Sequence, residues 1–126
     1  MGLLTGGVVK GLCKRAYKIT SFNAHDIKVY VRADEAGTNW ADATNGINYW
    51  TWGGDGSHGA TNNNWPGDKV TQKETIDGKQ WVVKTFRINS PTDYINFVFS
   101  VGTGSPQTVD VNNINKTTFI TIDSST

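Results

Sequence analysis

Apolar and polar residues alternate along several short stretches of this chain, which is the pattern of half-buried β-strands. Ile27, Val29 and Val31 alternate with Lys28, Tyr30 and Arg32 in one such stretch. The clearest is residues 94–101, where isoleucine, two phenylalanines and valine occupy every second position. We expect residues 94–101 to form a central strand.

Turn residues separate these stretches at intervals of about ten residues, as in an all-β sandwich. No helical periodicity of useful length follows residue 20, and there is no internal repeat. Glycine, asparagine and aspartate predict loops over residues 34–45 and 53–64. Further strands are expected over residues 47–52, 81–88, 108–111 and 117–122. The fold class predicted is all-β, an antiparallel β-sandwich.

A chain of 126 residues can bury one core. We expect one module over residues 26–126, preceded by a linker or upstream tail over residues 1–25. The basic residues near the start follow the small apolar runs rather than precede them, the reverse of a signal peptide. An export signal would therefore lie on a longer parent protein. No apolar window is long enough for membrane insertion.

Charge excludes several classes of partner. The chain has 12 basic and 11 acidic residues, too even a balance to gather nucleic acid or an anionic membrane. The single cysteine, Cys13, can form neither an internal disulfide nor a zinc pair. We expect a neutral or weakly charged ligand.

Tryptophans next to glycine and asparagine turns are the main candidate binding groups. Large aromatic rings at a surface are favoured when a flat apolar ligand, such as a sugar ring, covers them. Trp50 and Trp52 are two residues apart on an expected strand and point to one face. Either both are outward, with Ile47 and Tyr49 in the core, or Trp52 packs inward at a bulge and Trp50 alone is exposed.

Two other tryptophans need separate interpretations. Trp65 precedes Pro66, which favours an extended backbone and could hold the indole on a turn near Trp50. The alternative is that Trp65 only caps the end of the sandwich. Trp81 begins a strand next to Val82 and Val83, so we expect a core tryptophan there and leave it out of the site.

Catalysis and metal binding have little support in the sequence. Glycoside hydrolysis needs two carboxylates roughly 5–10 Å apart across a cleft, and no pair stands out among the scattered acidic residues. His25 and His58 have no partners at a metal-ligand spacing. Asp55 and residues 62–64 could supply oxygens to calcium, but their spacing fits no calcium loop. We expect a protein without enzymatic activity, metal or cofactor.

The chain resembles starch-binding modules of carbohydrate-binding module family 26 over about residues 26–123. The resemblance is carried by the order of these segments: Val29-Tyr30-Val31, Trp40, Ile47 to Trp52, Trp65-Pro66-Gly67-Asp68-Lys69-Val70, Trp81, Asn96 to Ser100, Gly104, and Gln107-Thr108-Val109-Asp110. It implies an immunoglobulin-like β-sandwich, attached to an amylase or a surface protein, that binds α-1,4-linked glucan without cleaving it.

The resemblance also implies which residues bind the sugar. Trp50, Trp65 and Trp52 are expected to stack on glucose rings, and Lys69 and Gln107 to form hydrogen bonds. Asn48 stands where related modules often have a tyrosine, and it is also expected to contact the sugar. The residue 53–64 loop is also long for the family.

The implied location is outside the cell or on its surface, bacterial in style, with a catalytic domain in the same parent chain. A protein-interaction sandwich of an extracellular assembly is the alternative.

Overall fold

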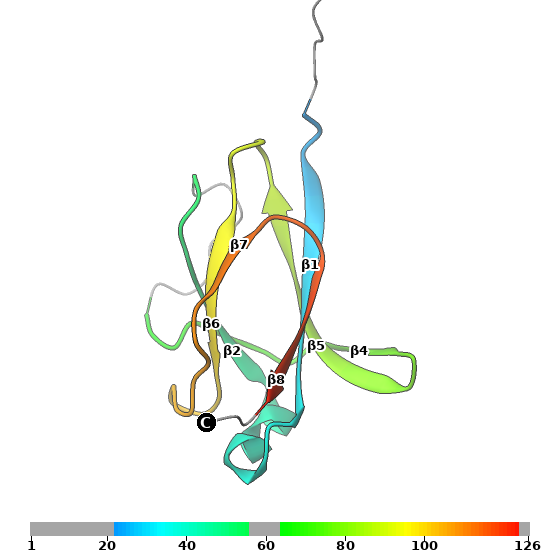
Figure 1. Ribbon diagram of the computed structural model, residues 1–126, viewed down its shortest axis with the longest axis vertical. Helices are drawn as coiled ribbons and strands as arrows, with labels where there is room; N and C mark the ends of the chain where they lie inside the picture. The colour runs from blue at the N-terminus through cyan, green and yellow to red at the C-terminus, as the bar shows by residue number, and fades with distance from the viewer. Residues whose placement is uncertain (1–21, 56–63, 124–126) are drawn as a thin grey trace, which may run out of the picture.

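Two β-sheets face each other in the computed structural model, which describes residues 22–55 and 64–123 (Figure 1). Sheet A has the strand order β4-β5-β1-β8, and sheet B has the order β3-β2-β6-β7. The strands are β1 (His25–Glu35), β2 (Ile47–Trp52), β3 (Asp68–Val70), β4 (Lys73–Ile76), β5 (Lys79–Ile88), β6 (Ile95–Ser100), β7 (Val111–Ile114) and β8 (Thr118–Asp123). The prediction of an all-β sandwich is confirmed.

One strand pair departs from antiparallel pairing. β1 and β8 are parallel, with Val29 opposite Thr118 and Val31 opposite Ile120. The chain passes from β7 in sheet B to β8 in sheet A, so β8 does not return as a hairpin within its own sheet. The other strand pairs in the described residues are antiparallel.

The core lies between the sheets and follows the alternation in the sequence. Val29 and Val31 of β1 face Tyr49, Phe97 and Phe99 of sheet B, and all five are fully buried. The Tyr49 hydroxyl donates to the carbonyl oxygens of Val29 (2.8 Å) and Val82 (3.3 Å) on the opposite sheet. Tyr49 thus joins the two sheets by packing and by hydrogen bonds.

Three short elements were not expected from the sequence. A 3₁₀ helix, η1 (Thr38–Asn45), replaces most of the loop predicted over residues 34–45, and it buries Trp40 to 7% exposure. β3 and β4 are the other two. Their few residues are mostly polar, so they show no clear alternation. β7 begins at Val111, later than the strand expected from residue 108.

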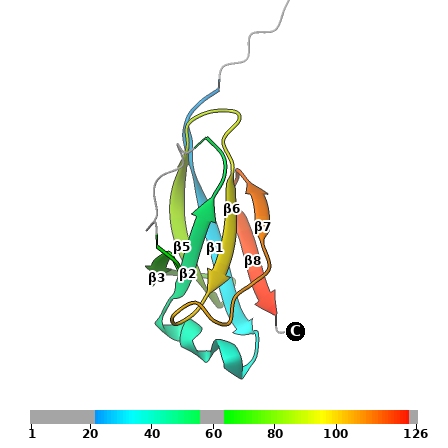
Figure 2. The same cartoon turned by 90° about the vertical axis from the view of Figure 1, so that its left-hand side faces the viewer.

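The outer face of sheet B is turned toward the viewer in Figure 2. β2 and β6 run side by side in the middle of that face, with β3 and β7 at its two edges. Side chains at alternate positions of β2 and β6 therefore lie on this outer face, and they include Asn48, Trp50 and Trp52 of β2.

Candidate functional site

β2 places two tryptophans on the outer face of sheet B. Tyr49 points into the core, so its neighbour Trp50 points outward, where it is partly exposed. Trp52 is 37% exposed and keeps an unbroken register with β6, opposite Asn96. The register has no bulge there, so both tryptophans are outward.

Trp65 reaches the same face from the turn before β3. Its ring centroid lies 5.8 Å from that of Trp50, and the two ring planes are inclined by 71°. Trp65 is 43% exposed, more than any other tryptophan that the structure describes. The two indoles meet edge to face, so they form a corner instead of a flat platform.

Glycine makes this position of Trp65 possible. Gly104, in the connection between β6 and β7, has a φ of 119°, and a Cβ there would collide with Nε1 of the Trp65 indole. Gly67 approaches β2 so closely that a Cβ would collide with the carbonyl oxygen of Tyr49. The indole of Trp65 therefore packs directly on the backbone of Gly104. The turn that carries Trp65 packs against the backbone of β2 at Gly67.

A polar row crosses the sheet next to the tryptophans. Asn48 on β2 is opposite Lys69 on β3 and Ser100 on β6, and Ser100 is opposite Gln107. Directly opposed residues point to the same face. Lys69 and Gln107 are both exposed. Their backbones are separated by three strand spacings, about 14 Å, so the two side chains lie at opposite ends of this row.

Asn48 itself is 1% exposed. Its Nδ2 donates to Ser100 Oγ and to the Gly102 carbonyl oxygen, each at 3.1 Å. The amide of Asn48 thus fastens the loop that carries Gly104 to β2. The structure gives it a positioning role under Trp65, whereas the sequence had suggested direct contact with the ligand.

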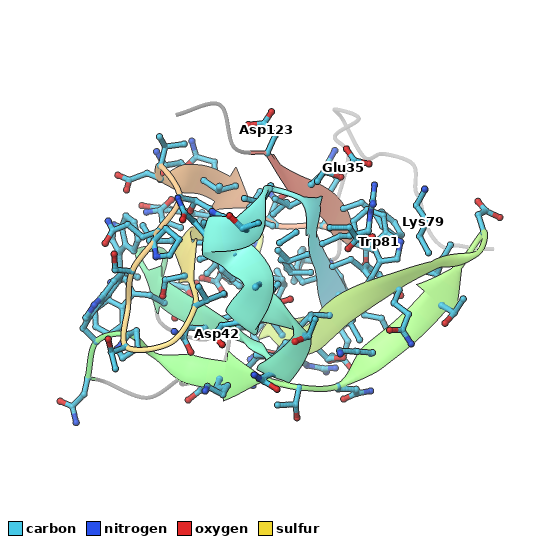
Figure 3. The ribbon with its side chains drawn as sticks, turned by 90° about the horizontal axis from the view of Figure 1, so that it is seen from below. Glu35, Asp42, Lys79, Trp81 and Asp123 are labelled. Carbon is cyan, nitrogen blue, oxygen red and sulfur yellow. The ribbon has the colours of Figure 1, made fainter. Side chains whose placement is uncertain are left out.

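A second aromatic cluster lies on the outer face of sheet A. Tyr30 and Phe119 stack with ring centroids 4.3 Å apart and planes inclined by 4°. The ring centroids of Trp81 and Phe119 lie 5.2 Å apart with planes inclined by 79°, and the Arg32 guanidinium lies 5.1 Å from the centroid of the Trp81 ring. Figure 3 shows Trp81 beside Lys79, on the side of the sheet away from the core.

The prediction of a core tryptophan at Trp81 is therefore wrong. Trp81 is partly exposed and lies outside the core between the sheets. Its neighbours Val82 and Val83 are both buried, although they point to opposite faces of the sheet. Val82 points into the core, whereas Val83 lies on the outer face, where Tyr30 on the neighbouring strand is directly opposite it. Sequence reasoning also missed Phe119, which is 50% exposed. An aromatic among threonines on a strand, as at Phe119, was the available signal.

Hydrogen bonds cross sheet A beside this cluster. Glu74 on β4 accepts from Lys28 Nζ (3.1 Å) and from the Tyr30 hydroxyl (3.0 Å) on β1. These two hydrogen bonds, with the Lys28 charge, hold the pKa of Glu74 below its usual value. The same contact raises the pKa of Lys28. Burial, with the hydrogen bond to Glu74, raises the pKa of Tyr30.

Other candidate groups are engaged elsewhere. Among the described residues, no three His, Cys, Asp or Glu side chains lie together as a metal site. Asp55 accepts a hydrogen bond from Ser90, and Asp34 and Glu35 pair with Arg32. His58, Asn62 and Asn63 lie outside the described residues, as does almost all of the predicted tail. No helix in the described part of the chain has the length and hydropathy to span a membrane.

The chain was compared with known proteins in three ways. No protein-family model matches it, and neither the curated proteins nor the solved structures give a significant match. The resemblance to starch-binding modules therefore depends on the sequence motifs alone.

Proposed function

We propose that this chain is a non-catalytic module that binds α-1,4-linked glucan through the outer face of sheet B. The observation that supports it best is the corner formed by Trp50 and Trp65, with rings 5.8 Å apart and inclined by 71°. Two partly exposed indoles in contact present apolar surface that a soluble protein normally covers. The apolar faces of sugar rings are suitable covers.

The inclination of the rings favours a coiled chain over a flat one. Successive glucose rings in an α-1,4 chain turn relative to one another, whereas a β-1,4 chain is a flat ribbon. A corner inclined by 71° suits rings that turn, and coplanar rings would suit a ribbon. Trp52 lies two residues along β2 from Trp50, roughly 7 Å away on the same face. It extends the apolar track by one position.

Polar groups at the ends of the polar row supply hydrogen bonds to the sugar hydroxyls. Lys69 donates from the β3 side, and Gln107 both donates and accepts from the β6 side. They stand at opposite ends of this row, and each contacts a different glucose unit of a chain that crosses the sheet. Asn48 acts from below, by fixing the loop on which Trp65 lies.

The expected affinity is modest. Stacking buries the faces of about two sugar rings, and the ordering of a flexible glucan offsets part of the gain. Dissociation constants of roughly 10 μM to 1 mM follow, about −4 to −7 kcal/mol. Such binding serves to keep an attached domain close to its polymer. In this proposal the parent protein carries an amylase-type domain and acts outside the cell or on its surface.

The experiment is a titration with maltoheptaose, followed by tryptophan fluorescence and calorimetry, with cellohexaose as the control ligand. Trp65→Ala should weaken binding at least about tenfold, since it removes one wall of the corner. Trp81→Ala, on the opposite sheet, is the matched control and should leave the affinity unchanged. Normal binding by Trp65→Ala and Trp50→Ala, with both variants folded, would show that the site is elsewhere.

A protein-interaction sandwich is the second candidate, and the exposed Phe119 next to Trp81 favours it. Exposed aromatics are common anchors in protein interfaces. In that case maltoheptaose would change neither fluorescence nor heat. Shortening of starch during incubation would indicate an enzyme instead.

A further inference from the structure

β8 forms a free edge of sheet A. It pairs with β1 on one side, and no strand of the described residues pairs with it on the other. Its six residues, Thr-Phe-Ile-Thr-Ile-Asp, are mostly β-branched or aromatic. Natural edge strands are usually protected by lysine, proline or a bulge in mid-strand. β8 has neither residue, and its one register shift relative to β1 is near its end, between Arg32 and Glu35.

The backbone N–H and C=O groups of Phe119 point to this free edge. The Lys28 N–H donates to Thr117 Oγ1 at 3.0 Å, so Lys28 turns its main-chain groups toward β8. Successive residues of a strand alternate between its two edges, so Tyr30 turns the same way. In a parallel pair, the residue opposite Tyr30 directs its own groups to the other side. That residue is Phe119.

An aromatic ladder ends at the same position. The ring of Tyr30 covers one face of the Phe119 ring, and the Trp81 ring is nearly perpendicular to the Phe119 ring. The other face of Phe119 is directed past the last strand of the sheet, which is consistent with its 50% exposure. A strand added at this edge would place a side chain against that face.

The charges along the edge have opposite signs at its two ends. Lys116 lies just before the start of β8 and is exposed, whereas Lys28 directs its ammonium away from this edge, to Glu74 on β4. Glu35 and Asp123 lie opposite each other where β1 and β8 end, and Figure 3 shows them together there. A strand that runs antiparallel to β8 and carries the same charges would bring each basic end beside an acidic end. β8 itself satisfies that requirement.

We propose that two copies of this chain associate by antiparallel pairing of their β8 edges, with Phe119 opposite the Phe119 of the second copy. This register brings Lys116 opposite Ile122, one residue from Asp123 of the second copy. It also makes the two Phe119 residues a hydrogen-bonded pair, in agreement with the direction of their main-chain groups. The association is isologous and closed, as two-fold symmetry requires.

A groove beside β8 leaves room for the added strand. It has a volume of about 640 Å³, and its walls include Ile120 and Ile122 of β8 and Val109 of the β6–β7 connection. Val109 is 82% exposed. In the proposed register Thr118 of the second copy is opposite Ile120, on the groove side, where the structure has space for it.

The pairing also fixes the orientation of the two copies. Opposed residues in an antiparallel pair share a face, so the two-fold axis is perpendicular to the extended sheet. Both copies of sheet B then lie on the same side. If the proposed function holds, two glucan sites face one polymer and bind it with avidity. The association itself does not depend on glucan.

Sedimentation velocity of the full chain over a range from micromolar to millimolar concentration tests the proposal. We expect a reversible monomer–dimer equilibrium. Phe119→Lys places a charge on the edge and should abolish the dimer. Thr121→Pro removes an N–H that points to the free edge, so it should preserve the fold and abolish the dimer as well. Trp65→Ala, on the other sheet, should dimerise like the parent chain.

Charge reversal tests the register. Lys116→Glu should weaken the dimer about tenfold, because two equivalent attractions become repulsions. Adding Asp123→Lys to the same chain should restore it. Circular dichroism checks that each variant is folded. A chain that stays monomeric to millimolar concentration, or a dimer that survives both Phe119→Lys and Thr121→Pro, would overturn the proposal. Normal maltoheptaose binding by the monomer would leave the proposed function standing.

Discussion

The position of the Trp65 indole depends on the absence of a side chain at Gly104. The indole lies on the backbone of Gly104, where no Cβ fits. The contact ties the turn before β3 to the connection after β6, so one tryptophan joins segments about forty residues apart in the chain. The orientation of the corner is thus set by a glycine that contributes no binding surface of its own.

Gly104→Ala should therefore displace Trp65 and weaken maltoheptaose binding at least about tenfold. Gly78→Ala is the matched control, because Gly78 also has a positive φ, of 82°, but a Cβ added there would meet no atom within 4 Å. Each substitution costs about 1–2 kcal/mol of stability through backbone strain. Calorimetric titration and thermal unfolding separate the two effects. Equal affinities for both variants would mean that the contact does not hold the ring in place.

Alternation in the sequence was enough to orient Trp50, because both alternatives left it outward, but it left Trp52 open between an outward position and an inward one at a bulge. The unbroken register with β6 decides for the outward position. Alternation could not reveal that Asn48, on the same face, is covered. That burial comes from the loop holding Gly102, which is remote in sequence. The expectation of a core Trp81 was wrong for the same kind of reason. The adjacent Val83 suggested a buried strand, but Val83 lies on the outer face, beside Tyr30 of a strand remote in sequence.

At the scale of elements, the strands that the sequence predicted are the long and alternating ones. β3 and β4 have three and four residues and consist largely of Asp, Lys, Glu and Thr. Their strand conformation comes from pairing with β2 and β5, which local propensity does not encode. η1 likewise lies in a segment without periodicity, and it forms because burial of Trp40 stabilises it.

β4 is fastened to β1 by side chains that pass over β5. Glu74 accepts from both Lys28 and Tyr30, and its pKa is lowered by these contacts. A depressed folded pKa contributes stability above the unfolded value, near pH 4.3, and that contribution is lost as pH falls through the folded pKa. Glu74→Gln should therefore flatten the acid side of the stability profile.

Urea unfolding at intervals from pH 2.5 to pH 7 measures this effect. The difference between the parent chain and Glu74→Gln should be constant above about pH 5 and shrink toward zero in acid. Lys28→Met provides the partner control, since it removes the main cause of the shift. A difference that does not change with pH would assign the contribution of Glu74 to packing instead of charge.

At the scale of the whole molecule, the near balance of 12 basic and 11 acidic residues predicts binding that is insensitive to salt. A neutral glucan held by stacking has no ion pair to screen. The dissociation constant for maltoheptaose should change less than about twofold between 50 mM and 500 mM NaCl. A much larger change would mean that ion pairs within the protein, and not stacking alone, control the binding of the sugar.

The parallel pairing of β1 and β8 has a mechanical consequence. These are the first and last strands that the structure describes, and they lie side by side with the same direction. The two ends of the folded unit therefore emerge at opposite ends of the molecule (Figure 1). Tension between those ends would load the hydrogen bonds between β1 and β8 together, in shear, instead of opening them one after another. A module anchored to a polymer on its face and pulled through its chain would resist extension with all of these bonds at once.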